Sequence, residues 1–334
     1  MSRRYAVIEI GTRGLRLLVA DASSKGIERV VRSTGEFSEL GQNQTSEGII
    51  PSQLIDRTKA IVSRYLDVAN QYKVNRIVAI ATEAVRSAKN RTKFLQEMSS
   101  LLEIRVLQPA EEALYSLVAT INAFRDQIAV DENILVIDQG GGSTELCFGS
   151  RKLDGTIVLQ GYESLPLGTA WLNKLFYEAG TLMDSYKRID QIVRLEINRH
   201  RNFINLSLKD PIKVFGLGSA ITIVAKRVAP QNSQGGISLS DLHGQFIAKE
   251  TLRKFLINSK RELTRLEKTL TAHVNAESDL ATLLTGLSTY YYILNKYRAS
   301  GITVSRHGVR YGLLLSLAGQ QSLIQLISDA RVDS

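Results

Sequence analysis

Two stretches of the chain share one unusual layout, which limits the folds open to it. Residues 5–22, YAVIEIGTRGLRLLVADA, and residues 133–150, NILVIDQGGGSTELCFGS, each run as apolar strand, acidic residue, glycine turn, hydroxyl residue and second strand. The acid is Glu9 in the first stretch and Asp138 in the second. The remaining matches are Gly11 with Gly140 and, once one extra glycine is allowed, Thr12 with Ser143. We interpret the repeat as two related domains facing each other across a cleft.

The rest of the chain alternates strand-like and helical patterns, which favours an α/β fold. Helical apolar spacing covers 51–72, and 76–82 is a short continuous apolar run typical of a buried strand. Further expected elements are a helix around 88–102, a strand at 104–107, a helix starting near Pro109, mostly helical sequence over 242–298 and an amphipathic helix over 308–330 that packs back on the first domain. We expect a first domain of residues 1–118 plus 313–334 and a second of residues 119–312.

Composition narrows the class of protein. The chain has 334 residues, of which 44% are hydrophobic and 22% charged, as in ordinary globular proteins. Its apolar runs are too short to span a bilayer, and its N-terminus shows no signal-peptide pattern, so we expect no membrane partner. A single cysteine excludes an internal disulfide and favours a cytoplasmic location.

The net charge of +9 favours polyanionic partners such as nucleic acid, anionic membranes or phosphorylated metabolites. Charge alone does not choose among them. Basic stretches at 198–203 and 252–268 have the composition of solvated helix faces, and they could steer a polyanion by their field.

The glycine loop of the second stretch suits a phosphate. Consecutive N–H groups in a Gly-rich turn form a nest for phosphate oxygens, and glycine lets the phosphate approach closely. The loop glycines are Gly140, Gly141 and Gly142, and Ser143 adds a hydroxyl donor. Asp138 before the loop could hold Mg²⁺, and Glu145 could return a second carboxylate to the same region. The alternative is a hairpin whose glycines only supply turn dihedral angles.

Two other segments carry weaker signals. PAEEA at 109–113 opens a helix, where acids commonly pair with the helix dipole but where a carboxylate could also act as general base. GLGSA at 216–220 is a third strand–turn–helix unit, and its Gly216, Gly218 and Ser219 could contact phosphate.

Several blocks occur together, in order, over nearly the whole chain: ATEAVRSAKN (81–90), PAEEA (109–113), VIDQGGGSTEL (136–146), SLPLGTAWL (164–172), GLGSA (216–220), DLHGQFIAKETL (241–252) and VSRHGVRYGLLL (304–315). With these blocks the chain resembles the exopolyphosphatase / guanosine pentaphosphate phosphohydrolase (Ppx/GppA) family, short two-domain form, of the actin-like ATPase superfamily. The resemblance implies two ribonuclease-H-like domains facing each other across a cleft, with the second enlarged by helices.

The resemblance also implies a function. Members release a terminal phosphate from inorganic polyphosphate or guanosine pentaphosphate, with Mg²⁺. By motif position, Glu112 matches the catalytic base, and Asp138 and Glu145 match the carboxylates that organise metal and water. Arg86 would add a guanidinium suited to phosphate. A homodimer through the helical second domain is plausible for the family.

The first loop departs from the family pattern. Members commonly read Asp-x-Gly-Ser-Asn-Ser there, whereas this chain reads EIGTRGLRL over 9–17. Glu9, a metal ligand by position, projects its charge one methylene further, and Thr12 keeps a hydroxyl. Arg13 replaces a small amide; together with Gly11 it could bind phosphate, or it could fill the substrate's space. Arg306, Tyr311 and Trp171 also stand where relatives commonly carry other residue types.

Three functions therefore compete. The leading one is a Mg²⁺-dependent phosphoanhydride hydrolase. The second is a sensor or assembly protein that binds nucleotide or polyphosphate without turnover. The third, nucleic-acid binding, rests on charge alone and is the least favoured.

Overall fold

The structure is a computed structural model, and it describes residues 2–41, 48–177, 181–199, 212–230, 239–268, 279–319 and 324–326. The chain divides into two compact units. Unit 1 comprises Met1–Arg125, Arg151–Leu159 and His307–Ser334, and unit 2 comprises Asp126–Ser150 and Gln160–Arg306. The chain thus passes from unit 1 to unit 2 mainly at 125/126 and returns at 306/307. The boundaries expected from the sequence were 118/119 and 312/313.

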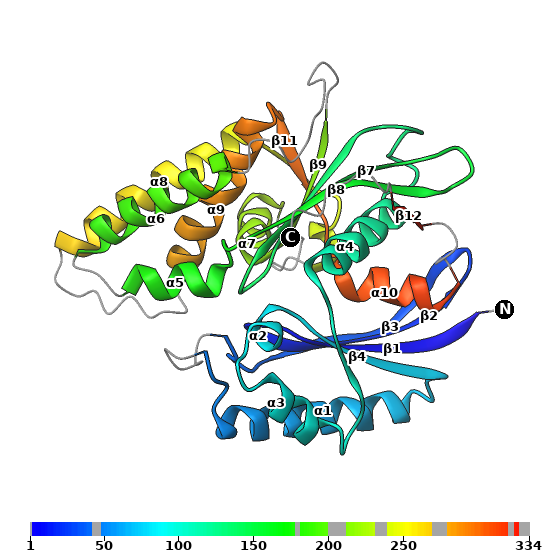
Figure 1. Cartoon of the computed structure of the whole chain (residues 1–334). Coiled ribbons are helices and arrows are strands. Elements are labelled where there is room, and N and C mark those ends of the chain that lie inside the picture. The colour runs from blue at the N-terminus through cyan, green and yellow to red at the C-terminus, as the bar shows by residue number, and fades with distance from the viewer. Residues whose placement is uncertain are drawn as a thin grey trace. The chain divides into compact units, whose positions relative to one another are not determined.

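Unit 1 is built on a five-stranded sheet of order β3-β2-β1-β4-β5 (Figure 1). β1, β2 and β3 are antiparallel neighbours, whereas β4 runs parallel to β1 and β5 parallel to β4. The strands are β1 (Arg3–Ile10), β2 (Gly14–Ser23), β3 (Gly26–Phe37), β4 (Arg76–Ala81) and β5 (Ile104–Val106). This sheet confirms the expected first hairpin and the strands after it.

Helices cover both faces of this sheet because side chains alternate along β1. Ala6 and Ile8 are fully buried in the cluster that includes α1 and α3 side chains, and Val7 is buried in the cluster with α4 and α10. Figure 1 shows α1 and α3 on one face of the sheet and α4 and α10 on the other. The helices of unit 1 are α1 (Ser52–Gln71), α2 (Glu83–Arg86), α3 (Arg91–Met98), α4 (Pro109–Ala123) and α10 (Val309–Leu317).

The second sheet has seven strands in the order β10-β11-β9-β6-β7-β8-β12. β6 (Ile134–Gln139) is antiparallel to β7 (Thr144–Arg151) and parallel to β9 (Lys213–Gly218), which places the second glycine hairpin near the middle of the sheet. The other strands are β8 (Ile157–Leu165), β10 (Phe246–Ala248), β11 (Gly301–Val304) and β12 (Ile324–Leu326).

Unit 2 is enlarged by helices packed into one apolar core. Leu135 and Ile137 of β6 are buried in it together with Tyr290, the first tyrosine of the aromatic stretch at 290–297. The helices are α5 (Thr169–Tyr177), α6 (Leu182–Arg199), α7 (Ser219–Val228), α8 (Lys249–Lys268) and α9 (Asp279–Lys296), with the short 3-10 helix η1 (Leu239–Leu242). The two sheets flanked by helices confirm the predicted α/β, actin-like class.

The single C-terminal helix expected over 308–330 was wrong. α10 ends at Leu317, and residues 324–326 form β12 beside β8. Gly319 has a φ of 105°, a left-handed conformation that stops a helix at little steric cost. α10 packs against α4 and β1.

Among the described helices, none combines the length and hydropathy that a bilayer crossing requires.

Candidate functional site

The β6–β7 hairpin brings two carboxylates together. Asp138 and Glu145 are direct partners in the antiparallel ladder, so their side chains lie on one face of the sheet with Cβ atoms about 4.5–5.5 Å apart. Glu145 is buried and Asp138 is half-buried. The expectation that Glu145 returns a carboxylate to the region of Asp138 is therefore confirmed.

The loop between these strands turns its backbone amides away from α5. The Gly140 N–H donates to the Ser143 carbonyl at 2.9 Å and closes the turn. The Gly140 carbonyl accepts from the Thr169 N–H at 3.0 Å, and the Gly141 carbonyl accepts from the Ala170 N–H at 2.8 Å. In a trans peptide the carbonyl and the following N–H point in opposite directions. The amides of Gly141 and Gly142 consequently point away from α5, as an anion-binding nest requires.

Gly168 lets this contact form. A Cβ at Gly168 would lie 2.2 Å from the carbonyl carbon of Gly142 and 2.3 Å from the carbonyl oxygen of Gly141. Those atoms are backbone and have no rotamer with which to give way. The glycine therefore sets how closely α5 approaches the loop.

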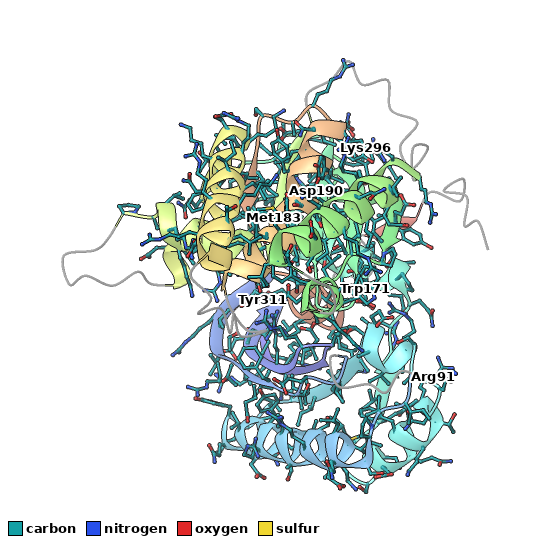
Figure 2. The ribbon with its side chains drawn as sticks, turned by 90° about the vertical axis from the view of Figure 1, so that its left-hand side faces the viewer. Arg91, Trp171, Met183, Asp190, Lys296 and Tyr311 are labelled. Atoms are coloured by element: carbon teal, nitrogen blue, oxygen red, sulfur yellow. The ribbon has the colours of Figure 1, made fainter. Side chains whose placement is uncertain are left out.

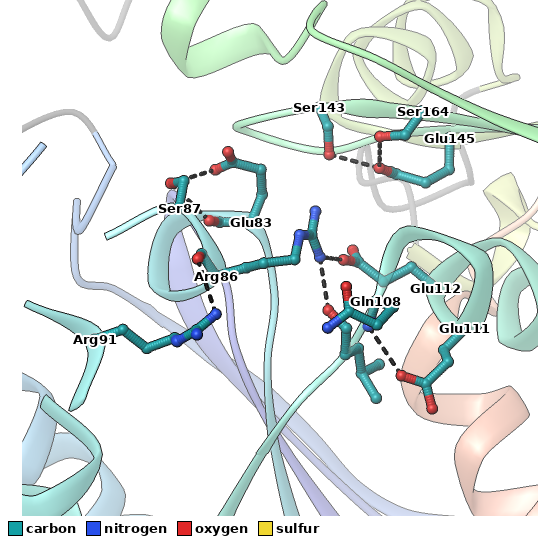
Figure 3. Close-up of polar contacts among 11 residues, drawn as sticks. Glu83, Arg86, Ser87, Arg91, Gln108, Glu111, Glu112, Ser143, Glu145 and Ser164 are labelled. Atoms are coloured by element: carbon teal, nitrogen blue, oxygen red, sulfur yellow. Dashed lines mark hydrogen bonds and ion pairs between the residues drawn. The ribbon is translucent and has the colours of Figure 1, made fainter. Parts of the chain in front are cut away.

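Two serines orient Glu145 (Figure 3). The hydroxyls of Ser143 and Ser164 both donate to Glu145 Oε1, at 2.5 and 3.0 Å. Thr144 is buried, and its hydroxyl donates to the Leu167 carbonyl at 2.8 Å, which ties β7 to the end of β8. The single hydroxyl proton of Ser143 is thus donated to Glu145, so the hydroxyl would have to leave this carboxylate before it could donate to a phosphate.

The negative charge of Asp138 raises the pKa of two buried neighbours. Burial, and then the Asp138 carboxylate, raises the pKa of the Cys147 thiol well above its ordinary value. The same two causes raise the pKa of the Tyr290 phenol. Tyr290 therefore stays protonated and donates to the Leu217 carbonyl. The charge of Asp138 thus acts on buried side chains of unit 2.

These residues fit a magnesium ion. Within the described ranges, no group of three or more His, Cys, Asp or Glu side chains could hold a metal alone. Mg²⁺ prefers one or two carboxylates, with the remaining oxygens from water and substrate phosphates. The Asp138–Glu145 pair beside a phosphate nest supplies this donor set.

The GLGSA segment is positioned by the same sheet. Gln139 of β6 pairs with Gly218 of β9, so the start of α7 lies beside the end of β6. A Cβ at Gly218 would lie 2.4 Å from the Gln139 carbonyl oxygen, and one at Gly216 would lie 2.4 Å from Ile302 Cδ1. Both glycines thus serve close packing. Ser219 is the first residue of α7, where helix N–H groups favour anions.

The β1–β2 hairpin of unit 1 repeats the loop geometry. The Gly11 N–H donates to the Gly14 carbonyl at 3.1 Å, and the carbonyls of Thr12 and Arg13 accept from backbone N–H groups of residues 38–41. Thr12 is buried, and a Cβ at Gly41 would lie 2.1 Å from Thr12 Cγ2. The Arg13 guanidinium lies 5.4 Å above the Phe37 ring, so the structure gives this cation an aromatic partner.

Glu9 has a cationic partner. Arg310 Nε lies 3.1 Å from Glu9 Oε2, with side-chain exposures of 11% and 19%, and its Nη1 donates to the Leu17 carbonyl at 3.3 Å. Desolvation lowers the pKa of Arg310, while Glu9 opposes that shift. A metal at Glu9 would have to share the carboxylate with a buried guanidinium.

Glu112 lies at the start of α4, where Gln108 and Glu111 form a capping box. Its side chain is buried and forms an ion pair with Arg86, whose Nη1 also donates to the Leu107 carbonyl at 2.8 Å (Figure 3). The two blocks AVR and EEA therefore meet in unit 1. Arg86, expected to bind phosphate, holds the carboxylate expected to act as base.

Sequence reasoning missed two residues of these networks. Ser164 lies in the SLPLGTAWL block, and Arg310 lies in the VSRHGVRYGLLL block. Both residues lie in motif blocks, but only tertiary contacts show that their side chains bind Glu145 and Glu9.

Similar proteins share only part of this sequence. The bifunctional 3-dehydroquinate synthase/phosphatase of Fusobacterium nucleatum is 27% identical over 184 residues, 52% of this chain and 26% of that protein. Exopolyphosphatase 2 of Mycobacterium tuberculosis is 27% identical over 157 residues, 45% of this chain and 49% of that protein. The matched regions thus span about a quarter and a half of these relatives' own length.

Solved structures match over almost the whole chain. An Aquifex aeolicus PPX-GPPA enzyme has a TM-score of 0.71 at 25% identity, covering 95% of this chain and 100% of its own. An exopolyphosphatase from Cytophaga hutchinsonii has a TM-score of 0.75 at 17% identity, covering 94% and 97%, and supports the fold alone. The Ppx/GppA phosphatase family model matches residues 18–321. The chain belongs to the Ppx/GppA phosphatase family.

Proposed function

We propose that the protein is a Mg²⁺-dependent phosphoanhydride hydrolase that releases the terminal phosphate of inorganic polyphosphate, guanosine pentaphosphate or both. The observation that carries the proposal is the β6–β7 hairpin. There a pair of carboxylates lies next to the backbone amides of Gly141 and Gly142, which point away from α5. The exopolyphosphatases among the similar proteins support the choice of substrate class.

The proposed roles follow from the contacts of each group. The amides of Gly141 and Gly142 would bind oxygens of the terminal phosphate, and Asp138 and Glu145 would hold Mg²⁺. The bound ion would neutralise charge on the phosphate oxygens. Ser143 and Ser164 keep Glu145 in one rotamer through its Oε1.

Glu112 is proposed as the general base. It takes a proton from a water molecule whose oxygen forms a new bond to the terminal phosphorus. The bond from that phosphorus to the bridging oxygen breaks, and the shortened chain leaves with the bridging oxygen. Arg86 holds the base in place, and Glu112 returns its proton to solvent after orthophosphate departs.

The first test measures phosphate release by the purified chain with Mg²⁺ on long-chain polyphosphate, guanosine pentaphosphate and ATP. Glu112→Gln should reduce release by about 10²–10⁴-fold, the usual contribution of a general base. Glu111→Gln is the matched control, since it removes the same charge one residue away and retains an oxygen for the capping box. Equal loss in both variants, or release by Glu112→Gln at the wild-type rate, would refute the assigned base.

A second function is favoured by one observation, the Glu9–Arg310 ion pair. Arg310 binds the carboxylate of Glu9, which the family resemblance predicts to be a metal ligand. A chain with only one metal-competent hairpin could bind polyphosphate or nucleotide as a sensor or assembly protein without cutting it. Tight binding of a substrate by folded protein, without phosphate release and unchanged in Glu112→Gln, would establish this alternative.

A further inference from the structure

The helical part of unit 2 contains a cavity that shares no residue with the 140–143 loop. Its volume is about 550 Å³, within the range of small-ligand sites. Helices α6 and α8 supply the residues that matter here: Tyr186, Lys187, Asp190, Arg194, Asn198 and Lys260. Figure 2 labels Asp190 among these helices.

Two tyrosines donate hydrogen bonds to Asp190, the one carboxylate among these lining residues. Tyr186 donates to Asp190 Oδ1 at 2.9 Å, and Tyr292 of α9 donates to Asp190 Oδ2 at 2.9 Å. Burial, and next the bond to Asp190, raises the pKa of Tyr292 to about 12, so this hydroxyl remains a donor at neutral pH. Burial likewise raises the pKa of Tyr186. Both oxygens of Asp190 therefore accept hydrogen bonds from tyrosine hydroxyls, which disperses part of the carboxylate's charge.

The same tyrosine rings position two cations. Lys260 Nζ lies 4.7 Å from the centroid of the Tyr186 ring, and the Arg194 guanidinium lies 5.7 Å from that of Tyr292. Cation–π contacts of this kind hold long side chains without neutralising them. Lys187 also lines the cavity and pairs with exposed Asp184 at 3.2 Å. Among the described lining residues, positive charge thus outweighs negative.

We infer that this cavity is a second binding site for a phosphate chain, separate from the glycine loop. Arg194 and Lys260 donate to the phosphate oxygens and the Asn198 amide adds a neutral donor. The role we give the site, anchoring another segment of a long polyphosphate during hydrolysis, rests on the proposed function. The binding itself does not depend on hydrolysis.

The test uses the full chain carrying Glu112→Gln, titrated calorimetrically with tripolyphosphate. We compare Arg194→Gln/Lys260→Gln with a matched control, Arg188→Gln/Lys254→Gln. The control removes two charges from the same two helices at positions that do not line the cavity. We expect one binding event to weaken at least about tenfold in the first variant and to persist in the control, because charge-assisted hydrogen bonds are lost only there.

Each outcome decides the inference. Equal weakening in both variants would mean that only overall charge matters and would overturn the site, as would an unchanged titration. A change of molecular mass in light scattering on Arg194→Gln/Lys260→Gln, without ligand, would make the face an interface between copies and would also overturn it.

Two further measurements distinguish nucleotide from polyphosphate as the ligand, and the second binding site from the proposed hydrolysis. Titration with ATP shows whether a nucleotide's phosphates compete with tripolyphosphate for the event lost in the Arg194/Lys260 variant. In the wild-type background, the same pair of substitutions should raise KM for long-chain polyphosphate and leave kcat unchanged. If the wild-type chain releases no phosphate but the Arg194/Lys260-dependent binding remains, the proposed function fails and the second site stands.

Discussion

The two glycine hairpins close with similar turns but carry different charges. In each, a glycine N–H closes the turn on a carbonyl three residues later, and a following segment binds the loop carbonyls. The ladder then pairs Asp138 with Glu145 in one hairpin and Glu9 with Arg16 in the other, where Arg310 adds a second cation. A repeated loop therefore need not carry the same charged side chains. The β6–β7 hairpin places two carboxylates side by side, whereas the β1–β2 hairpin places its carboxylate beside two arginines.

Removing one carboxylate from each hairpin tests whether the two hairpins contribute differently to catalysis. Glu145→Gln should reduce kcat by about 10³-fold, roughly 4 kcal/mol, because charge that stabilises the transferring phosphoryl group is lost. Glu9→Gln, which removes a carboxylate already bound to Arg310, should cost about tenfold or less. Phosphate release at saturating Mg²⁺ measures both. Equal losses would show that the hairpins act alike.

The Glu9–Arg310 pair should matter more for stability than for chemistry. Arg310→Met leaves a largely buried carboxylate without its cation and should lower the free energy of unfolding by about 3 kcal/mol. The double variant Glu9→Gln/Arg310→Met should recover most of that loss, since no charge remains unpaired. Urea unfolding followed by circular dichroism measures the difference. A double variant as unstable as Arg310→Met would contradict the assignment.

Gly168 and Gly41 each pack against a glycine loop, the first against loop backbone and the second against the Thr12 side chain. Gly168→Ala drives a Cβ into the backbone of Gly141 and Gly142, and we expect a loss of about 2 kcal/mol in stability together with reduced phosphate release. Gly41→Ala meets Thr12 Cγ2, part of a side chain that can change rotamer, so its cost should be smaller. Thermal unfolding of the two variants side by side tests this order.

The smallest expected effect concerns the serine that orients Glu145. Ser164→Ala removes one of two hydroxyl donors to Oε1 and should cost about 1 kcal/mol in kcat/KM, with a raised Mg²⁺ requirement. Ser164→Thr retains the hydroxyl and should restore activity. A thermal midpoint shift in Ser164→Ala without any change in Mg²⁺ dependence would indicate a purely structural role.

Much of the fold was predictable because its signals are local. The apolar run before each acid, the glycine turn and the helical spacing of 51–72 depend on neighbours in the chain. The extent of the final helix was mispredicted because its apolar pattern continues beyond Gly319, whereas the backbone there is left-handed. The start of α4 at Pro109 was correct because proline and the capping box act within four residues.

The candidate site was predictable only in its parts. The residue pattern indicated Asp138, Glu145 and the loop glycines, and the family resemblance indicated Glu112. The ladder register confirms that the carboxylates of Asp138 and Glu145 share a face. Their roles stay predictions. Sequence could not show that Arg86 binds Glu112, or that Arg13 lies over Phe37, because these pairs are joined by folding over 26 and 24 residues.

By itself, the sequence determined the two hairpins, the α/β class and the acids beside the glycine loops, since each follows from residue order and short-range backbone preference. Only the tertiary structure decided which charges meet. Arg310 reaches Glu9 from 301 residues away, and Ser164 reaches Glu145 from the next strand. The strength of an electrostatic interaction depends on the distance between the charges and on their burial, and the spacing of residues along the chain determines neither.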